Sequence, residues 1–574
     1  MLLKTICVLG VLCASVVNAF ALDREAFTFT NYDLDVRVEP EQQRLAVRGK
    51  ITLRNDSASP QKNVFLQISS GLDWRSVQIG GKAVQFVSQP YLSDLDHAGG
   101  LSEAIVMLPQ PVAPNGTVEI EVGYEGTIAL DITRLTGIGV PEEAAKHTDW
   151  DQIGKAFTAV RGVGYVVWYP VATESADLGE GNSLFETVGR WKEKEGAAQM
   201  RVNFCSTSPT GLMNDERGAA TGVSSSATTA GVNCEEHTFT PLRHTTPAFV
   251  LGDYSTLDRP AVAIHYLPGH KPNAEDFALA VELGAPFVTE WFGAPRRKAV
   301  VAELADPQAA PFESGSMLLT PLSPSADTRL VQMTAVHQLT HAAFPSERLW
   351  IYEGLAHFAQ AAFREQQSGR KAALDFMAQH RTAVANAENT ITAEHDKGAA
   401  ARESLVNTSV EELYRSKAMY VWWMLRDMVG EAALKKALAA YRPEEDKAPS
   451  YVQRLIEAQS KRDLEWFFDD WVYRDRGLPD FRVDSAIPRA TVGGGYVVTV
   501  SVENLGQAGA EVPVTLKVEG GEITKRLEAR AKSKAVVRIE APTAPQEVTV
   551  NDGSVPESDM SNNVLKIETG TLPK

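Results

Sequence analysis

The spacing of apolar residues divides the chain into three parts. From Asn31 to about Asp258, apolar and polar residues alternate in short runs that are separated by turn-rich pieces such as RNDSASPQ and IGGK. This period of two predicts antiparallel β-strands. The runs include Leu34, Val36 and Val38, then Val64, Phe65 and Leu66, and then Val118, Ile120 and Val122.

The middle of the chain has longer apolar segments with helical spacing. Between about Ala261 and Pro479 they are AEDFALAVELGAPFVTEWFG, LVQMTAVHQLTHAAF, ERLWIYEGLAHFAQAAFREQQ and SVEELYRSKAMYVWWMLRDMVG, all longer than a typical strand. From about Val483 the alternation returns in YVVTVSVEN, VPVTLKVEG and AVVRIEA, which suits a β-sandwich. The pattern predicts a multidomain α+β protein with a β-rich domain over residues 22–258, a mainly helical domain over 259–481 and a β-sandwich over 482–574.

The first 21 residues predict a secretory signal peptide that is not part of the fold. Lys4 precedes the apolar run ICVLGVLCASVV, and Val17-Asn18-Ala19 and Ala19-Phe20-Ala21 offer two small-residue cleavage signatures. A lipid anchor at Cys13 is the alternative, but a bulky leucine precedes this cysteine where that signal needs a small residue. Later apolar runs fall short of the ~18 residues that a membrane-spanning helix needs. We therefore expect an exported chain, periplasmic or extracellular, with no transmembrane segment in its mature form.

Removal of that segment would leave Cys205 and Cys234 as the remaining cysteines. A cysteine pair in an exported chain predicts a disulfide, and two unpaired thiols are the alternative. The bond would close the Gly-, Ser-, Thr- and Ala-rich segment STSPTGLMNDERGAATGVSSSATTAGVN. In the chain-entropy description such a closure stabilises the fold by roughly 3–4 kcal/mol.

Composition narrows the classes of function. The chain has 574 residues, and its hydrophobic fraction of 44% excludes a mainly disordered protein. Its 56 basic and 73 acidic side chains give a formal net charge of −17, with no obvious basic stripe. Such a surface repels polyphosphate, so nucleic acid is not expected as a partner.

Two histidines in the middle part have the spacing of metal ligands. His337 and His341 lie four residues apart on a predicted helix, so both imidazoles project from one face and one zinc ion can bridge them. From Leu330 to Ser346 there is no formally charged residue, and from Leu349 to Phe363 the only one is Glu353. A carboxylate in so apolar a stretch needs a compensating cation. We predict zinc held by the two histidines and Glu353, with a fourth position open as in hydrolytic sites.

The order of these residues resembles that of the membrane alanyl aminopeptidase family of gluzincin zinc metallopeptidases. The segment from His337 to His341 resembles the family's His-Glu-x-x-His helix, and WIYEGLAHF resembles the following helix, whose glutamate is the third ligand. Tyr414 in LYRSKAMY resembles the tyrosine that stabilises the tetrahedral intermediate. His357, one helical turn beyond Glu353, could also face the metal, although a buried core histidine is the more ordinary outcome.

The resemblance covers roughly Asn31 to Val483. Other pieces in the family's order are Tyr124-Glu125-Gly126, Trp168-Tyr169-Pro170 and FFDDWVYRDRGLPDF. It implies a thermolysin-like zinc metallopeptidase domain in the middle of the chain and a peptide or protein substrate. The last part resembles the immunoglobulin-like domains that are appended to many bacterial exported proteins.

Two motifs and the length of one connector depart from the family pattern. Gln338 stands where the family has the glutamate that takes a proton from the attacking water, and a glutamine amide cannot accept that proton. Losing a positioned general base typically costs 10²–10⁴ in rate. Glu313 in AAPFESGSMLL resembles the glutamate of the family's Gly-x-Met-Glu-Asn signature, which grips the substrate's amino group, but the glycine and methionine are missing. The connector between His341 and Glu353, eleven residues long, is also shorter than the family's.

These features predict an exported zinc metallopeptidase of the alanyl aminopeptidase type, which acts on peptide N-termini and is weakened or inactive because Gln338 replaces the base. The alternative is a pseudopeptidase that binds zinc and peptide, or holds an envelope partner, without hydrolysis. A third interpretation is that no metal binds and the two helices serve only as core.

Overall fold

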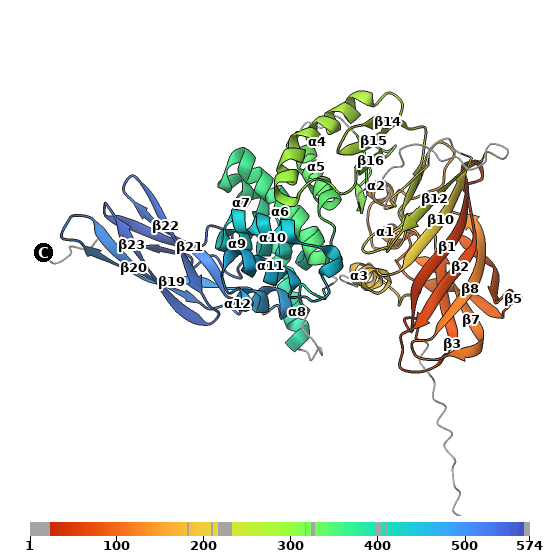
Figure 1. Cartoon of the computed structure of the whole chain (residues 1–574), viewed down its shortest axis with the longest axis horizontal. Helices are drawn as coiled ribbons and strands as arrows, with labels where there is room; N and C mark the ends of the chain where they lie inside the picture. Colours follow the sequence, from red (N-terminus) through yellow and green to blue (C-terminus); the bar gives the residue numbers. More distant parts are fainter. Residues whose placement is uncertain are drawn as a thin grey trace, which may run out of the picture.

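Three parts of the chain lie in a row, in the order in which they are synthesised (Figure 1). The computed structural model describes residues 23–180, 183–207, 211–215, 232–315, 317–322, 328–396, 403–408 and 410–567. The expected signal peptide lies outside these ranges. Within them, no helix combines the length and apolarity that crossing a membrane requires.

The N-terminal part is β-rich, which confirms the prediction from the alternating pattern. Its two main sheets are formed by β1 (Phe27–Glu39), β2 (Arg44–Asn55), β3 (Gln61–Ser69), β4 (Leu72–Ile79), β5 (Lys82–Ala83), β6 (Phe86–Leu92), β7 (Gly100–Val112), β8 (Thr117–Thr127), β10 (Gln199–Ser206) and β12 (Asn233–Phe239). The larger sheet has the order β12-β10-β1-β2-β8-β4-β5, and the smaller one β3-β7-β6. Leu34, Val36 and Val38 all point into the core from β1, as their period of two requires.

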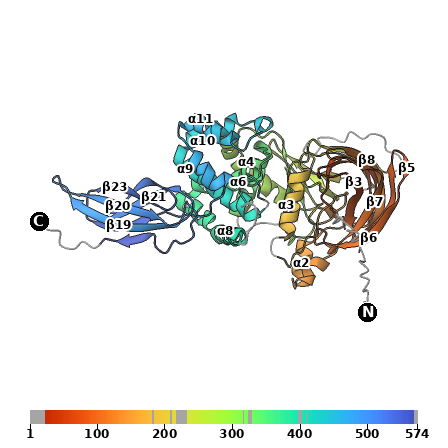
Figure 2. The ribbon, with the colours of Figure 1, turned by 90° about the horizontal axis from the view of Figure 1, so that it is seen from below.

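Cys205 and Cys234 lie opposite each other on the adjacent antiparallel strands β10 and β12, and they are joined by a disulfide. The remaining elements of this part are a short 3₁₀ turn η1 (Pro40–Gln42), the helices α1 (Thr133–Gly137), α2 (Glu142–Thr148) and α3 (Ser183–Glu195), and the small sheet β11 (Gly211–Met213), β13 (Phe249–Leu251) and β9 (Thr158–Val160). Helix α3 lies between the large sheet and the helices of the middle part in both views (Figures 1 and 2).

The middle part begins with a sheet that the mostly helical prediction missed. Its strands are β14 (Ser255–Asp258), β15 (Val262–Tyr266), β16 (Ala299–Glu303), β17 (Phe312–Ser314) and β18 (Met317–Thr320), in the order β14-β15-β16-β18-β17. Every residue of β16 is buried, so this strand shows no alternation for a period-based prediction to find. The edge strand β17 carries Glu313.

The predicted long helices are present in the middle part. They are α4 (Lys271–Phe292), α5 (Thr328–Ala343), α6 (Leu349–Ser368), α7 (Arg370–Ala378), α8 (Arg381–Asp396), the π-helical segment η2 (Glu412–Lys417), α9 (Ala418–Val429), α10 (Glu431–Ala440), the 3₁₀ turn η3 (Pro443–Glu445), α11 (Tyr451–Ser460), α12 (Glu465–Phe468) and the π-helical segment η4 (Asp469–Tyr473).

Helix α6 packs closely against α9, and this contact fixes the position of the site residues. The indole rings of Trp350 and Trp422 stack with their centroids 5.1 Å apart. A Cβ atom built on Gly354 would lie only 2.6 Å from the Cβ of Ala418, so glycine is what allows this approach. Glu353, the neighbour of this glycine, is thereby held beside η2.

The C-terminal part consists of two antiparallel sheets, in agreement with the predicted strands. The strands are β19 (Phe481–Ala490), β20 (Tyr496–Asn504), β21 (Ala510–Val518), β22 (Gly521–Ala529), β23 (Ser533–Ala541), β24 (Pro545–Val550) and β25 (Val564–Lys566). The sheet orders are β19-β20-β23 and β22-β21-β24-β25. The resemblance to an immunoglobulin-like domain stays a prediction.

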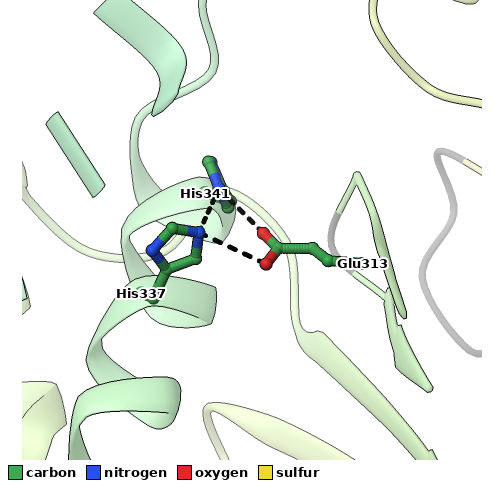
Figure 3. Close-up of side chains that lie close together, drawn as sticks. All are labelled: Glu313, His337 and His341. Carbon is green, nitrogen blue, oxygen red and sulfur yellow. Dashed lines mark hydrogen bonds and ion pairs between the residues drawn. The ribbon is translucent and has the colours of Figure 1, made fainter. Parts of the chain in front are cut away.

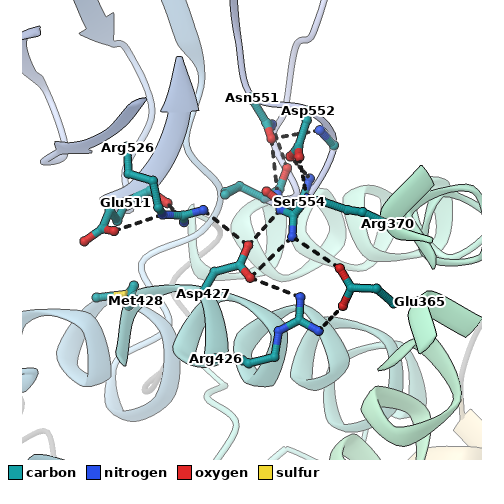
Figure 4. Close-up of polar contacts among 12 residues, drawn as sticks. Glu365, Arg370, Arg426, Asp427, Met428, Glu511, Arg526, Asn551, Asp552 and Ser554 are labelled. Carbon is teal, nitrogen blue, oxygen red and sulfur yellow. Dashed lines mark hydrogen bonds and ion pairs between the residues drawn. The ribbon is translucent and has the colours of Figure 1, made fainter. Parts of the chain in front are cut away.

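The middle and C-terminal parts are joined by a shared core and by ion pairs. One continuous cluster of buried apolar side chains extends from Val262 to Val555. Beside it, Asp427 of α9 accepts a hydrogen bond from Arg370 of α7 at 2.8 Å and another from Arg526 of β22 at 3.2 Å (Figure 4). The two parts are therefore packed together and are not separated by an extended linker.

The close approach of α6 and α9 can be tested by adding one methyl group. Gly354→Ala should destabilise the protein by roughly 1–3 kcal/mol, because the new Cβ overlaps Ala418 in a closed core. Urea unfolding followed by circular dichroism measures the change. Gly137→Ala is the matched control, since a Cβ at this exposed position meets no atom of the described residues within 4 Å. Equal stability of the two variants would show that the helices are not packed at this distance.

Candidate metal centre

Helix α5 brings two imidazoles to the spacing of ligands on one metal ion. The Nε2 atoms of His337 and His341 lie 3.1 Å apart, and both side chains are buried (Figure 3). Two nitrogen ligands at about 2.0–2.1 Å from a tetrahedral zinc ion would be separated by about 3.3 Å. The four-residue spacing therefore produces the convergence that the sequence predicts.

Glu313 lies closer to these histidines than the sequence indicates. Its Oε1 atom is 2.8 Å from Nε2 of His341, and its Oε2 atom is 3.2 Å from Nε2 of His337 (Figure 3). Burial disfavours the charge of Glu313, but the two imidazoles outweigh burial and hold the pKa of this carboxyl well below its ordinary value. The residue predicted to hold the substrate's amino group thus has the spacing of a third ligand.

Glu353, the predicted third ligand, belongs to the same cluster but lies farther from the histidines. Its carboxylate oxygens are 3.9 Å from Nε2 of His337 and 3.8 Å from Nε2 of His341. The guanidinium of Arg415 donates a hydrogen bond to Oε2 of Glu353 at 3.0 Å. Burial works against ionisation of Glu353, but Arg415 outweighs it, and the pKa of Glu353 is lowered.

Arg415 is a site residue that sequence reasoning missed. It follows Tyr414 in η2, a π-helical segment whose wider turn changes which side chains face the cluster. π-Helical segments occur frequently at functional sites, but a change of helix type leaves no clear mark on apolar periodicity. The arginine that directly follows Tyr414 in LYRSKAMY was the available signal.

His357 is the second unexpected member of the cluster. The sequence favoured a core histidine, but the structure places this ring on the wall of a cavity and 5.0 Å from the ring of His337. Ligand atoms of His337, Glu353 and His357 all lie within 4.8 Å of one another. Burial, together with the neighbouring His337, holds the pKa of His357 well below its ordinary value, so this ring is neutral and able to bind a metal.

The donor chemistry of the cluster fits zinc. Imidazole nitrogens and carboxylate oxygens are the ligands of hydrolytic zinc sites, and two three-residue sets offer them here: Glu313, His337 and His341, or His337, Glu353 and His357. Gln338 is buried, and neither polar atom of its amide has a hydrogen-bond partner among the described residues. An unsatisfied buried amide is costly, so its donor and acceptor are available to a ligand.

A cavity of 670 Å³ opens beside the cluster, between the N-terminal and middle parts. Glu313, His337 and His357 line it, together with Tyr414 and Gln360. Burial raises the pKa of Tyr414, so its phenol is protonated and able to donate a hydrogen bond. The predicted oxyanion-stabilising residue thus shares this space with Glu313 and with His337, one of the three predicted ligands.

Comparison with known proteins supports the fold. No protein-family model matches the chain. No curated protein matches it either. Among solved structures, aminopeptidase A of Legionella pneumophila in complex with aspartic acid has a TM-score of 0.59 at 14% identity, covering 93% of this chain and 59% of that one. An M1 zinc metallopeptidase of Deinococcus radiodurans has a TM-score of 0.47 at 15% identity, covering 78% of this chain and 94% of that one. The likeness to the Legionella protein shows a shared fold over 93% of this chain, which spans 59% of the length of the Legionella protein.

Variants of the cluster will identify the metal ligands. His337 belongs to both ligand sets, so His337→Ala should lose more zinc affinity than the roughly 10–100-fold that removal of a supporting residue costs. Competition titration with a chelating dye measures this loss. Between Glu313→Gln and Glu353→Gln, the variant with the greater loss marks the third ligand. His147→Ala is the control, since that histidine pairs with Asp306 and does not line the cavity. Zinc affinity that is unchanged in His337→Ala would refute a metal centre at this cluster.

Proposed function

We propose that this chain is an exported zinc peptidase of the aminopeptidase type, in which Gln338 has replaced the general base and left a slow reaction. The observation that carries the proposal is the convergence of two imidazoles and two carboxylates, those of His337, His341, Glu313 and Glu353, beside a cavity large enough for a short peptide. The disulfide between β10 and β12 is consistent with export, since such bonds persist in oxidising compartments.

The residues of the chain have distinct roles in this proposal. A zinc ion held by the cluster would polarise the scissile carbonyl of a peptide. The hydroxyl of Tyr414 would donate a hydrogen bond to the oxygen on which negative charge develops. The carboxylate of Glu313, where it is not a metal ligand, would bind the peptide's ammonium group. The amide of Gln338 would orient a water molecule by hydrogen bonding, but it has no basic site to take the proton.

A missing base explains why the reaction should be slow, because the other carboxylates that line the cavity are already engaged. Asp149 is bound by two guanidinium nitrogens of Arg134, each at 2.8 Å. Glu411 pairs with Arg415, and Glu313 pairs with the imidazoles. Among the described residues that line the cavity, no carboxylate is free to act as a base, and each engaged carboxylate is a weaker base because its partner stabilises its charge.

The same observation favours the second candidate, a pseudopeptidase that binds zinc and peptide without hydrolysis. Both candidates require the cluster and the cavity. They differ only in the activation free energy of peptide-bond hydrolysis. Measured turnover separates them.

Restoring the base is the direct test. Gln338→Glu should raise the rate of zinc-dependent hydrolysis of aminoacyl amides and peptides by roughly 10²–10⁴-fold over the wild type, and a chelator should abolish it. Gln360→Glu makes the same chemical change at a glutamine that lines the cavity and should give no such gain. A zinc-loaded, folded Gln338→Glu protein that hydrolyses nothing would exclude the peptidase and leave the binding protein.

A further inference from the structure

Helix α3 carries a lysine into the cavity beside the metal centre. Lys192 lies eight residues after Leu184 and four after Val188, so the three side chains are on one face of the helix, and all three line the cavity. α3 stands between the β-rich part and the middle helices (Figure 2). Lys192 therefore enters from the N-terminal part, whereas the metal-centre residues come from the middle part.

Lys192 has no ionic partner, in contrast with its charged neighbours. The other charged side chains that line the cavity form ion pairs: Arg134 with Asp149, Arg415 with Glu411 and Glu353, and Glu313 with His337 and His341. Lys192 forms no hydrogen bond and no ion pair through its side chain with any residue in the described ranges. Among the described residues that line the cavity, it is the one cation that remains available to a ligand.

The burial of Lys192 and the charges around it favour an anionic ligand at this position. Burial lowers the pKa of Lys192, and the nearby Arg415 lowers it further. Glu353, Glu411 and Glu313 partly offset these two effects from beyond ion-pair distance. These carboxylates are held by other cations and do not reach the lysine. An ammonium group in a partly buried site is costly without a compensating anion, so an anionic ligand is stabilised there.

We propose that Lys192 binds a carboxylate of the substrate and so makes the cavity selective for peptides that carry a negative charge at that position. Leu184 and Val188 line the cavity from the same face of α3 as Lys192, and these apolar side chains suit the aliphatic portion of the same peptide. The carboxylate is either the free C-terminus of a short peptide or the side chain of an aspartate or glutamate residue. This inference rests on the proposed function only in taking a peptide as the ligand of the cavity.

Peptide binding to the full-length protein tests the proposal without any need for turnover. Isothermal titration calorimetry compares Leu-Gly-Gly with its C-terminal amide, and Leu-Glu-Gly amide with Leu-Gln-Gly amide. In the wild type, the charged member of at least one pair should bind roughly 10–100-fold more tightly than the uncharged member. Selectivity in the first pair identifies the C-terminal carboxylate, and selectivity in the second identifies an acidic side chain.

Variants of α3 assign the effect to the lysine. Lys192→Met should abolish the difference within the pair, and Lys192→Arg should keep most of it. Arg190→Met is the matched control, because this exposed residue lies two positions earlier on α3, does not line the cavity and carries the same charge. Thermal unfolding shows that each variant is folded.

Three results would overturn the proposal: undiminished selectivity in Lys192→Met, an equal loss of affinity for charged and uncharged peptides, or no binding of either charged peptide to the wild type. The outcome is independent of hydrolysis. Turnover by Gln338→Glu without a carboxylate preference would reject the role of Lys192 and keep the peptidase. Selective binding without turnover would keep the role of Lys192 and reject the peptidase.

Discussion

The need to compensate one buried and one half-buried carboxylate controls the arrangement of the cavity. Glu313 and Glu353 come from different elements, and either charge would cost several kcal/mol if it were left alone in this apolar surrounding. Two imidazoles form ion pairs with Glu313, and the guanidinium of Arg415 donates a hydrogen bond to Glu353. β17, α5, α6 and η2 must therefore meet at one point, because each supplies one partner of these contacts.

The absence of charged residues on α5 after Arg329 follows from the same constraint. Its residues from Ala335 to Ala343 are all buried, so another charge on this helix would compete for the same few cations. Gln338 is consistent with such a surrounding, since an amide of nearly the same size avoids a further buried charge. In the proposed peptidase, the neutral side chain lowers the rate, because it cannot take the proton from the attacking water.

Local patterns predicted most of the fold and half of the cluster. Alternation located the strands of both β-rich parts, and the spacing of His337 and His341 placed two imidazoles together, because these are properties of one segment. The sheet β14 to β18 was missed because its central strand is buried on both faces. The contacts of Glu313, Arg415 and Lys192 were missed for another reason: they join residues that are far apart in the chain, and no period records such contacts.

The junction between the middle and C-terminal parts has a consequence for how the protein would respond to a partner. The two parts share one core, and Asp427 is bonded to arginines from both (Figure 4). Two bodies joined in this way do not swing independently, and they are expected to lose their structure in one cooperative step. A partner that bound the C-terminal sheets would therefore also fix the orientation of the cavity relative to that partner.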